Sequence, residues 1–240
     1  MIKGVLEPII DVIYPPLCVS CKKPYQRGHN AHLSSECYVA IERHVPPFCP
    51  RCGRGLQHIH DIRSGICARC TDKKYSFDMA WSLCHYEGLC KDLIHDFKYK
   101  QKLHYKSIFA QLLKEFVNTY KRLSECAMII PIPLHMVKLR EREYNQSAIL
   151  ADLLGELLQK PVRTDCLERI RNTKPQFDLD EQNRIENIKG CFRVTNGQAL
   201  RAQSIVIVDD VLTTGATLSE ASRMIREYDP TAIEVLAVAS

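Results

Sequence analysis

The sequence lacks any long hydrophobic run. Its uninterrupted apolar stretches reach only four or five residues, as at 205–208, whereas a membrane-spanning helix needs about 18 or more. Lys3, Glu7 and Asp11 break the apolar start of the chain, so the hydrophobic region of a secretory signal is missing as well. These absences argue against a membrane span and against export, and we expect a cytoplasmic protein.

The composition has neither a shortage of hydrophobic residues nor an excess of charge. Hydrophobic residues make up 45% of the 240 residues and charged residues 25%, close to the averages of globular proteins. At about 150 residues per domain, this length suits one medium domain with a small appendage, or two domains. Apart from a recurring Cys-x-x-Cys unit, we find no internal repeat and no low-complexity linker, so we expect the chain to fold.

Cysteine is plentiful and unevenly placed. Nine of the twelve cysteines precede Lys91, and without an export signal such a cluster favours metal thiolates over disulfides. Residues 1–76 carry a net charge of +5, whereas 77–240 hold equal numbers of acidic and basic residues. We therefore expect an N-terminal helix and zinc module at 1–76 and a second domain at 77–240. The basic surplus is compatible with a nucleic-acid partner.

Two Cys-x-x-Cys pairs have the spacing of a zinc ribbon. Cys49 and Cys52 form the first pair, and Cys67 and Cys70 follow after 14 intervening residues. Each pair lets two thiolates reach one ion from a tight turn, and two such turns complete a tetrahedral shell of four sulfurs. The pattern predicts a structural Zn²⁺ ion on these four cysteines.

A second metal site is less complete. Cys18 and Cys21 form another pair, but Cys37 is their only evident partner, because Ser34 stands where a matching turn would place its first thiol. A fourth ligand from His29 or His32, an empty or degraded site, and pairing with a later Cys-x-x-Cys turn all remain open. The other cysteines are isolated in apolar settings and suit small buried residues.

The rest of the chain alternates strands and helices. Hydrophobic patterns predict strands at 80–86, 127–132, 204–208 and 232–238, and helices at 89–99, 105–121, 145–159, 178–187 and 217–228. The segment 163–203 is otherwise polar and irregular. Such alternation indicates an α/β fold with a parallel sheet flanked by helices.

The segment 205–221, IVIVDDVLTTGATLSEA, has the chemistry of a phosphate site. Asp209 and Asp210 end an apolar strand and can accept hydrogen bonds from ribose hydroxyls. A Thr-Thr-Gly turn then opens a helix, whose first amides bind phosphate, and Gly215 permits a close approach or a positive φ. The segment resembles the phosphoribosyl diphosphate (PRPP) motif of type I phosphoribosyltransferases. That resemblance assigns the ribose to the two aspartates and the 5′-phosphate to Thr213, Thr214, Gly215, Ala216 and Thr217.

The order of motifs along nearly the whole chain resembles the ComF family: the zinc module, FKY at 97–99, IPIPLH at 130–135, LREREYNQ at 139–146, RIRNTKPQ at 169–176 and the PRPP motif. Family members usually have Gly-Phe where this chain has Glu143 and Tyr144, and Ser34 is a second departure. The resemblance implies a PRPP or ribose 5-phosphate ligand with Mg²⁺, and a role in uptake of transforming DNA alongside a competence helicase. The alternative is an active phosphoribosyltransferase with an unknown acceptor.

Three further groups of residues are candidates for binding. Arg140 and Arg142 are suited to bind a diphosphate or a nucleic-acid phosphate, because arginine is the better phosphate fork. Arg169, Arg171, Thr173, Lys174 and Gln176 lie in a segment that resembles the mobile hood over PRPP sites. Cations alternate with aromatic residues at Lys98, Tyr99, Lys100, Lys102, Tyr105 and Lys106, as in proteins that bind single-stranded DNA. His135 has no identifiable carboxylate partner, so the sequence assigns no catalytic residue.

Overall fold

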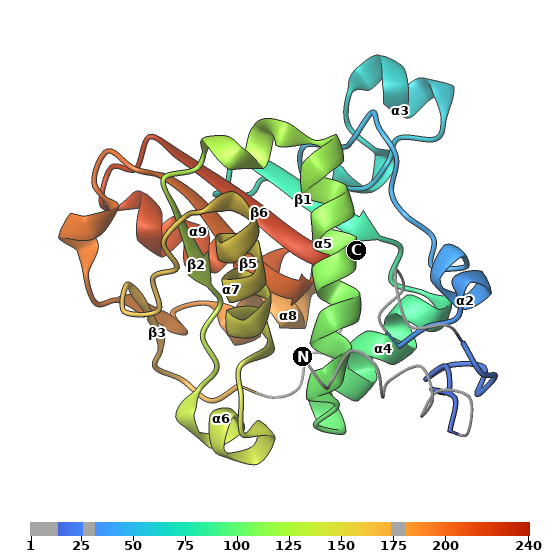
Figure 1. Ribbon diagram of the computed structural model, residues 1–240. Coiled ribbons are helices and arrows are strands. Elements are labelled where there is room, and N and C mark those ends of the chain that lie inside the picture. The colour runs from blue at the N-terminus through green and yellow to red at the C-terminus, as the bar shows by residue number, and fades with distance from the viewer. Residues whose placement is uncertain (1–13, 26–31, 174–180) are drawn as a thin grey trace.

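The computed structural model describes residues 14–25, 32–173 and 181–240. At its centre lies a four-stranded parallel sheet (Figure 1), with the strand order β1 (Met79–Cys84), β6 (Ala232–Ala239), β5 (Ser204–Val211) and β2 (Met128–Pro131). Apolar residues fill these strands on both faces, because helices cover a parallel sheet from both sides. The predicted α/β fold with a parallel sheet is confirmed.

The predicted helices are also present, and their described ends differ from the predicted ends by at most two residues. They are α4 (Gly88–Tyr99), α5 (Lys106–Thr119), α7 (Gln146–Leu158), α8 (Glu181–Ile188) and α9 (Ala216–Arg226). The expected N-terminal helix and the start of the helix predicted at 178–187 lie outside the described residues. Within the described ranges, no helix combines the length and the apolar character needed to cross a membrane.

Several short elements escaped the sequence patterns. Two of them are helices, α2 (Ser35–Val39) and α3 (Ile59–Ser64), in the cysteine-rich region, and a third helix, α6 (Met136–Arg142), follows β2. The segment expected to be irregular contains an antiparallel hairpin of β3 (Leu167–Arg169) and β4 (Phe192–Val194). Strands of three residues contain too few alternations to show a period, so their sequence alone does not reveal them.

The sheet separates two hydrophobic cores. Along β5, Val206 and Val208 face the core that α5 and α7 cover, whereas Ile205 and Ile207 face the core that α9 covers. In Figure 1, α5 and α7 lie in front of the sheet and α9 lies behind it. This division follows from the two-residue period of a strand, whose successive side chains point to opposite faces.

The cysteine-rich region covers the free edge of β1. Its residue Arg43 forms an antiparallel bridge with Cys84, and the Ala80 amide donates to the Pro50 carbonyl at 2.7 Å. An uncovered edge strand would present unpaired backbone groups to other chains. The cysteine-rich region therefore satisfies backbone groups of the sheet as well as holding its own cysteines.

Residues of the cysteine-rich region also enter both cores. Leu33 and Tyr38 pack in the core of α5 and α7, while Cys49 and Cys70 belong to the core of α9. The division of the chain into two domains at 76/77 therefore stays a prediction about folding units. In the structure, residues from both sides of that point pack in the same hydrophobic cores.

Candidate functional site

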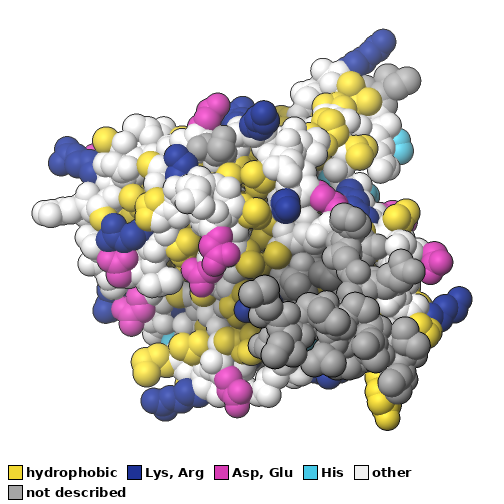
Figure 2. All heavy atoms as spheres, viewed as in Figure 1, with side chains coloured by type: hydrophobic (Ala, Val, Ile, Leu, Met, Phe, Trp, Pro, Cys, Tyr) yellow, Lys and Arg dark blue, Asp and Glu magenta, His cyan; other side chains and the backbone are white. Residues whose placement is uncertain are grey.

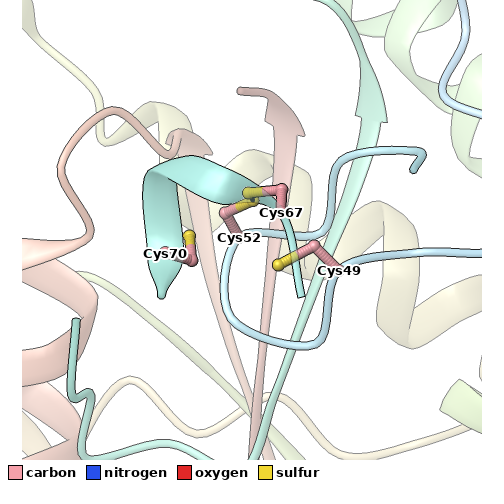
Figure 3. Close-up of side chains that lie close together, drawn as sticks. All are labelled: Cys49, Cys52, Cys67 and Cys70. Atoms are coloured by element: carbon pink, nitrogen blue, oxygen red, sulfur yellow. Dashed lines mark hydrogen bonds between the residues drawn. The ribbon is translucent and has the colours of Figure 1, made fainter. Parts of the chain in front are cut away.

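The structure gathers the four cysteines that the sequence assigns to one zinc ion. Cys49 and Cys52 lie on the loop beside β1, whereas Cys67 and Cys70 lie at the two ends of a short 3₁₀ segment. Their sulfur atoms all lie within 4.8 Å of one another, and Figure 3 shows them gathered around a common space. All four residues are buried, so this group is a candidate structural metal centre.

A glycine allows the first Cys-x-x-Cys turn to pack directly on the sheet. Gly53 has a φ of 73°, and a Cβ atom at this position would lie 2.5 Å from the backbone nitrogen of Ser82 in β1. Its amide donates to the Cys49 carbonyl at 2.8 Å, which closes the turn. A residue with a side chain would therefore separate the turn from the sheet.

The thiol chemistry of this cluster fits a divalent cation. Hydrogen bonding with Cys52 holds the pKa of Cys49 well below its usual range, while the same interaction raises the pKa of Cys52 to about 12. The pKa of Cys70 is also raised, first by its hydrogen bond to Cys49. A second thiolate is thus strongly disfavoured beside the first. A Zn²⁺ ion would remove this conflict, because it binds four thiolates in a tetrahedral shell.

The second group contains three thiols. The sulfur atoms of Cys18, Cys21 and Cys37 lie within 4.8 Å of one another, and Ser34 is beside them with its Oγ 3.7 Å from the Cys21 sulfur. Burial raises the pKa of Cys18, but backbone hydrogen bonds, led by Ser34, outweigh it and lower the value to about 6.

A serine hydroxyl therefore lies beside the three thiols, where a fourth cysteine would complete the set. His32, one of the two histidines considered as a ligand, instead lies near Tyr25, with 3.5 Å between Nδ1 and the phenol oxygen, and it is not part of the cluster. His29 lies outside the described residues. The two cysteine groups are separate, so the structure does not support pairing of Cys18 and Cys21 with a later turn.

We expect purified protein to hold zinc at both groups but to lose it faster from the three-thiol group, because a serine hydroxyl is a weaker zinc ligand than a thiolate. Replacing Ser34→Cys should slow this release, as followed with a coloured zinc chelator. Ser35→Cys adds a thiol at the neighbouring position, which is exposed, and serves as the control. Less than about half a zinc per chain, or equal release from wild type and Ser34→Cys, would contradict this assignment.

A cavity of about 820 Å³ lies at the carboxyl end of β5, where open α/β sheets bind ligands. Its walls come from β5 and the loop before α9, from α4, from α6 and the start of α7, and from the β3–β4 region. The predicted binding residues that line it include Arg142, Asp209, Asp210, Thr213, Thr214, Gly215, Ala216 and Thr217. Arg140 is exposed and does not line the cavity.

The two aspartates lie within β5 and not beyond it. The sequence pattern predicted a strand that ends at 208, but β5 continues to Val211, with Asp209 opposite Ala237 of β6. Ser147 at the start of α7 donates to Asp209 Oδ1 at 2.9 Å. Pairing with β6 thus fixes the backbone that carries both carboxylates, although a run of charged residues does not itself indicate a strand.

Lys98 forms an ion pair with the second carboxylate, with its Nζ 2.8 Å from Asp210 Oδ1. Burial alone would lower the pKa of Lys98, but the charge of Asp210 and the hydrogen bond to it raise the pKa. Burial and the charge of Asp210 raise the pKa of Asp209 to about 7, against the effect of Lys98. One ion pair and one carboxyl that titrates near neutrality therefore lie side by side.

The position of Lys98 corrects the sequence interpretation of the run at 98–106. This lysine points into the cavity, Tyr105 is buried, and Lys100 is paired with Asp96 at 2.8 Å. The six residues therefore do not form one exposed track, because they lie on the end of α4, the segment after it and the start of α5, and their side chains face different surroundings. Lys98 is instead a residue of the ligand site, which its FKY motif already marked.

The loop before α9 has the geometry of an anion site. Gly215 takes a left-handed φ of 79° directly before the first residue of α9, and Thr214 Oγ1 accepts a hydrogen bond from the Ala216 amide at 3.4 Å. The first amides of a helix carry partial positive charge and lack partners within the helix. The loop can therefore hold a phosphate group at the wall of the cavity.

Three cations gather on another wall. Arg142 lies over the ring of Tyr99 at 4.8 Å from its centroid, and burial followed by the charges of Arg142 and Arg169 lowers the pKa of Lys138. Burial is also the main cause that lowers the pKa of Arg169. Crowded cations are relieved by an anionic ligand, so this wall suits a phosphate or diphosphate.

Glu143 adopts the conformation that a glycine would provide. It ends α6 with a left-handed φ of 67°, which disfavours residues with a side chain by roughly 1 to 2 kcal/mol. The backbone therefore turns as a Gly would turn it, and the aromatic Tyr144 next to it donates a hydrogen bond to the Phe97 carbonyl.

His135 accepts a hydrogen bond from the Val137 amide and so caps the start of α6.

Only some residues of the predicted hood line the cavity. Arg169 and Thr173 line the cavity and are joined by a 2.6 Å hydrogen bond. Arg171 instead donates to the carbonyl of Asn187 in α8. Lys174 and Gln176 lie outside the described residues.

Comparison with known proteins identifies both parts of the chain. A double zinc ribbon domain matches residues 9–71, and a phosphoribosyl transferase domain matches residues 146–240. These matches, together with the cysteine groups and the cavity, define a zinc-ribbon protein with a phosphoribosyltransferase-like domain.

Three relatives are similar in sequence over most of this chain. Competence protein F of Haemophilus influenzae is 29% identical over 226 residues, which cover 92% of this chain and 96% of that protein. DNA utilization protein YhgH of Escherichia coli K12 is 29% identical over 92% of this chain and 95% of its own. Competence protein ComFC of Bacillus subtilis is 26% identical over 80% of this chain and 76% of its own. These similarities to proteins named for competence and DNA utilization confirm the resemblance to the ComF family that the order of motifs indicates.

Solved structures are similar over a shorter part. Glutamine PRPP amidotransferase from Bacillus subtilis, complexed with ADP and GMP, aligns with a TM-score of 0.35 and 18% identity over 51% of this chain. A structure of the allosteric regulatory enzyme of purine biosynthesis aligns with a TM-score of 0.38 and 20% identity over 54% of this chain. The matched region is about a quarter of each of those chains.

The raised pKa of Asp209 has a consequence for stability. The folded protein holds this proton more tightly than the unfolded chain does, so ionisation of Asp209 weakens the fold as pH rises from about 4 to about 7, with no further loss above. Asp209→Asn removes the charge. We therefore expect the free energy of unfolding of this variant, relative to wild type, to rise between pH 4.5 and pH 7.5.

Urea unfolding at a series of pH values measures this difference. Asp229→Asn, at an exposed turn position with a left-handed φ of 52° that Asn tolerates, is the matched control and should follow wild type. A constant difference between Asp209→Asn and wild type over this pH range would show that Asp209 titrates normally.

Proposed function

We propose that the cavity binds a phosphoribosyl ligand, with PRPP as the substrate that its chemistry fits best. The observation that carries the proposal is the presence of three complementary surfaces in one cavity: two carboxylates, an anion-binding loop and a wall of cations. PRPP offers ribose hydroxyls, a 5′-phosphate and a diphosphate to these surfaces in turn.

Each part of the ligand has a candidate partner. The carboxylates of Asp209 and Asp210 would accept hydrogen bonds from the ribose hydroxyls, and the loop at 213–217 would hold the 5′-phosphate through its amides and hydroxyls. Arg142 and Arg169 would receive the diphosphate, because guanidinium groups bind phosphate oxygens in pairs. Arg140 is left out of this proposal because it does not line the cavity.

The carboxylates also suit a Mg²⁺ ion that arrives with the ligand. Mg²⁺ prefers oxygen ligands and is usually bound through one or two carboxylates together with phosphates of the substrate. When bound, it would neutralise part of the diphosphate charge. Lys98 keeps Asp210 in an ion pair. Asp209 has a pKa near 7, and a nearby cation would favour its ionised form.

For the cellular role we propose uptake or use of DNA in the cytoplasm. The support comes from relatives named for competence and for DNA utilization and from the net charge of +5 on residues 1–76. Single-stranded DNA and a competence helicase are the partners that this role implies. On the face shown in Figure 2, basic side chains are scattered among acidic ones, so we expect DNA contacts to depend on individual lysines and on salt.

A second candidate function is catalysis by the same cavity. Its volume of about 820 Å³ leaves room for an acceptor beside the ribose, and the cation wall would stabilise a leaving diphosphate. The transfer would break the bond between ribose C1 and the diphosphate oxygen and join C1 to the acceptor. Release of diphosphate from PRPP and Mg²⁺ over a panel of bases tests this function, and the absence of release with every base would leave binding alone.

Calorimetry with PRPP and Mg²⁺ tests the binding site. Replacing Asp209 and Asp210 together by Asn should weaken binding at least tenfold, because a hydrogen bond to a charged group contributes about 1.5 to 3 kcal/mol. Asp229→Asn replaces an exposed acidic residue elsewhere in the chain and is the control for the loss of an acidic residue. Unchanged affinity in a folded double variant would remove the two carboxylates from the ligand site.

Salt dependence tests DNA binding separately. Replacing Lys100, Lys102 and Lys106 with Gln should lower the slope of log affinity against log salt by about two units, since each phosphate contact on a single strand contributes about 0.7. Lys98→Gln should leave that slope unchanged, because Lys98 is paired inside the cavity. Affinity that ignores salt, or no binding at low ionic strength, would favour the enzymatic function.

A further inference from the structure

Tyr75 connects the end of the cysteine-rich region to the phosphate-binding loop. Its hydroxyl donates to the carbonyl oxygen of Thr214 at 2.9 Å. Its ring covers Gly215 so closely that a Cβ atom on this glycine would lie 2.6 Å from Tyr75 Cε1. The ring is itself stacked on Phe77, with 4.8 Å between centroids and 11° between planes. One side chain thus supports the loop at the residue with the left-handed backbone.

The residues after Tyr75 are fastened to α9, which the phosphate loop opens. The Ser76 amide donates to Ser219 Oγ at 3.1 Å. Arg226 donates to the Ser76 carbonyl at 3.1 Å and to Asp78 Oδ1 at 2.7 Å. The chain that follows Tyr75 is therefore held against α9.

The residues before Tyr75 are fastened to the four-cysteine group. Arg51, between Cys49 and Cys52, donates from one guanidinium nitrogen to the carbonyls of Cys70 at 2.5 Å, Thr71 at 3.0 Å and Lys73. The turn between Cys49 and Cys52 thereby holds the segment that follows the turn between Cys67 and Cys70. Any ion that binds the four thiolates fixes both turns, and with them the segment that ends at Tyr75.

We infer that Tyr75 is a positioning residue through which metal binding at Cys49, Cys52, Cys67 and Cys70 sets the affinity of the 213–217 loop for phosphate. The inference builds on the proposed phosphoribosyl ligand. A loop already in its binding conformation loses less entropy when the ligand arrives. Without the ion, the two turns lose their common ligand, and the segment that Arg51 connects to Tyr75 loses its support.

The first test measures ribose 5-phosphate affinity in the full chain loaded with zinc. Tyr75→Phe keeps the ring but removes the hydrogen bond to Thr214, and one such bond corresponds to a loss of about fivefold. Tyr75→Ala should weaken binding further, because the ring over Gly215 is also lost. Tyr14→Phe, at a residue that is 77% exposed, is the control for loss of a phenol and should bind as wild type does.

The second test asks whether the metal acts through the same residue. Cys70→Ser should lower the affinity to a similar degree as Tyr75→Ala, and the double variant should be little worse than either single variant, because the two act in series. Cys37→Ser removes a thiol from the group that belongs to the other core and should leave the affinity unchanged.

A third measurement does not depend on the ligand. Amide hydrogen exchange at 213–217 should become faster in Cys70→Ser and in Tyr75→Ala, but not in Cys37→Ser, while exchange in β5 and β6 stays slow and reports an intact fold. If wild type binds ribose 5-phosphate and all variants bind equally, the link through Tyr75 is wrong. If wild type fails to bind, the proposed ligand is wrong, and the exchange rates alone then decide the link: equal rates in all variants would overturn it.

Discussion

The structure depends on the need to cover a small parallel sheet on both faces and at its free edge. Four strands leave β1 with unpaired backbone groups and two apolar faces, and such a sheet is stable only when both faces are buried. The cysteine-rich region meets this need, since it bonds to β1 and contributes residues to both cores. A region that looks like an appendage in the sequence is thus part of the main core.

This arrangement separates the two cysteine groups. Cys18 belongs to the core of α5 and α7, whereas the four-cysteine group lies in the core of α9, the helix that the phosphate loop opens. The groups also differ in their ligands, three thiols and a hydroxyl against four thiols. The four-thiol group, which we expect to bind zinc more tightly, is therefore also the group that contacts connect to the ligand site.

The ligand site contains buried charged groups, each of which would destabilise the fold without a partner. Lys98 pairs with one of two adjacent carboxylates, and three cations crowd another wall of the cavity. Burial raises the cost of each unpaired charge. A ligand that carries hydroxyls, phosphates and a bound cation satisfies all of these groups together, which explains why carboxylates and guanidinium groups line the same cavity without neutralising each other directly.

The sequence by itself determined the order of the longer strands and helices, the grouping of Cys49, Cys52, Cys67 and Cys70, and the phosphate loop. These features are encoded locally, in the period of apolar residues, in the spacing of cysteines and in the chemistry of a short turn. Only the tertiary structure decided that Lys98 enters the cavity, that the Ser34 hydroxyl lies beside Cys21, and that Tyr75 supports Gly215. These contacts join residues from separate elements, and their partners depend on how strands and helices pack, which no local pattern records.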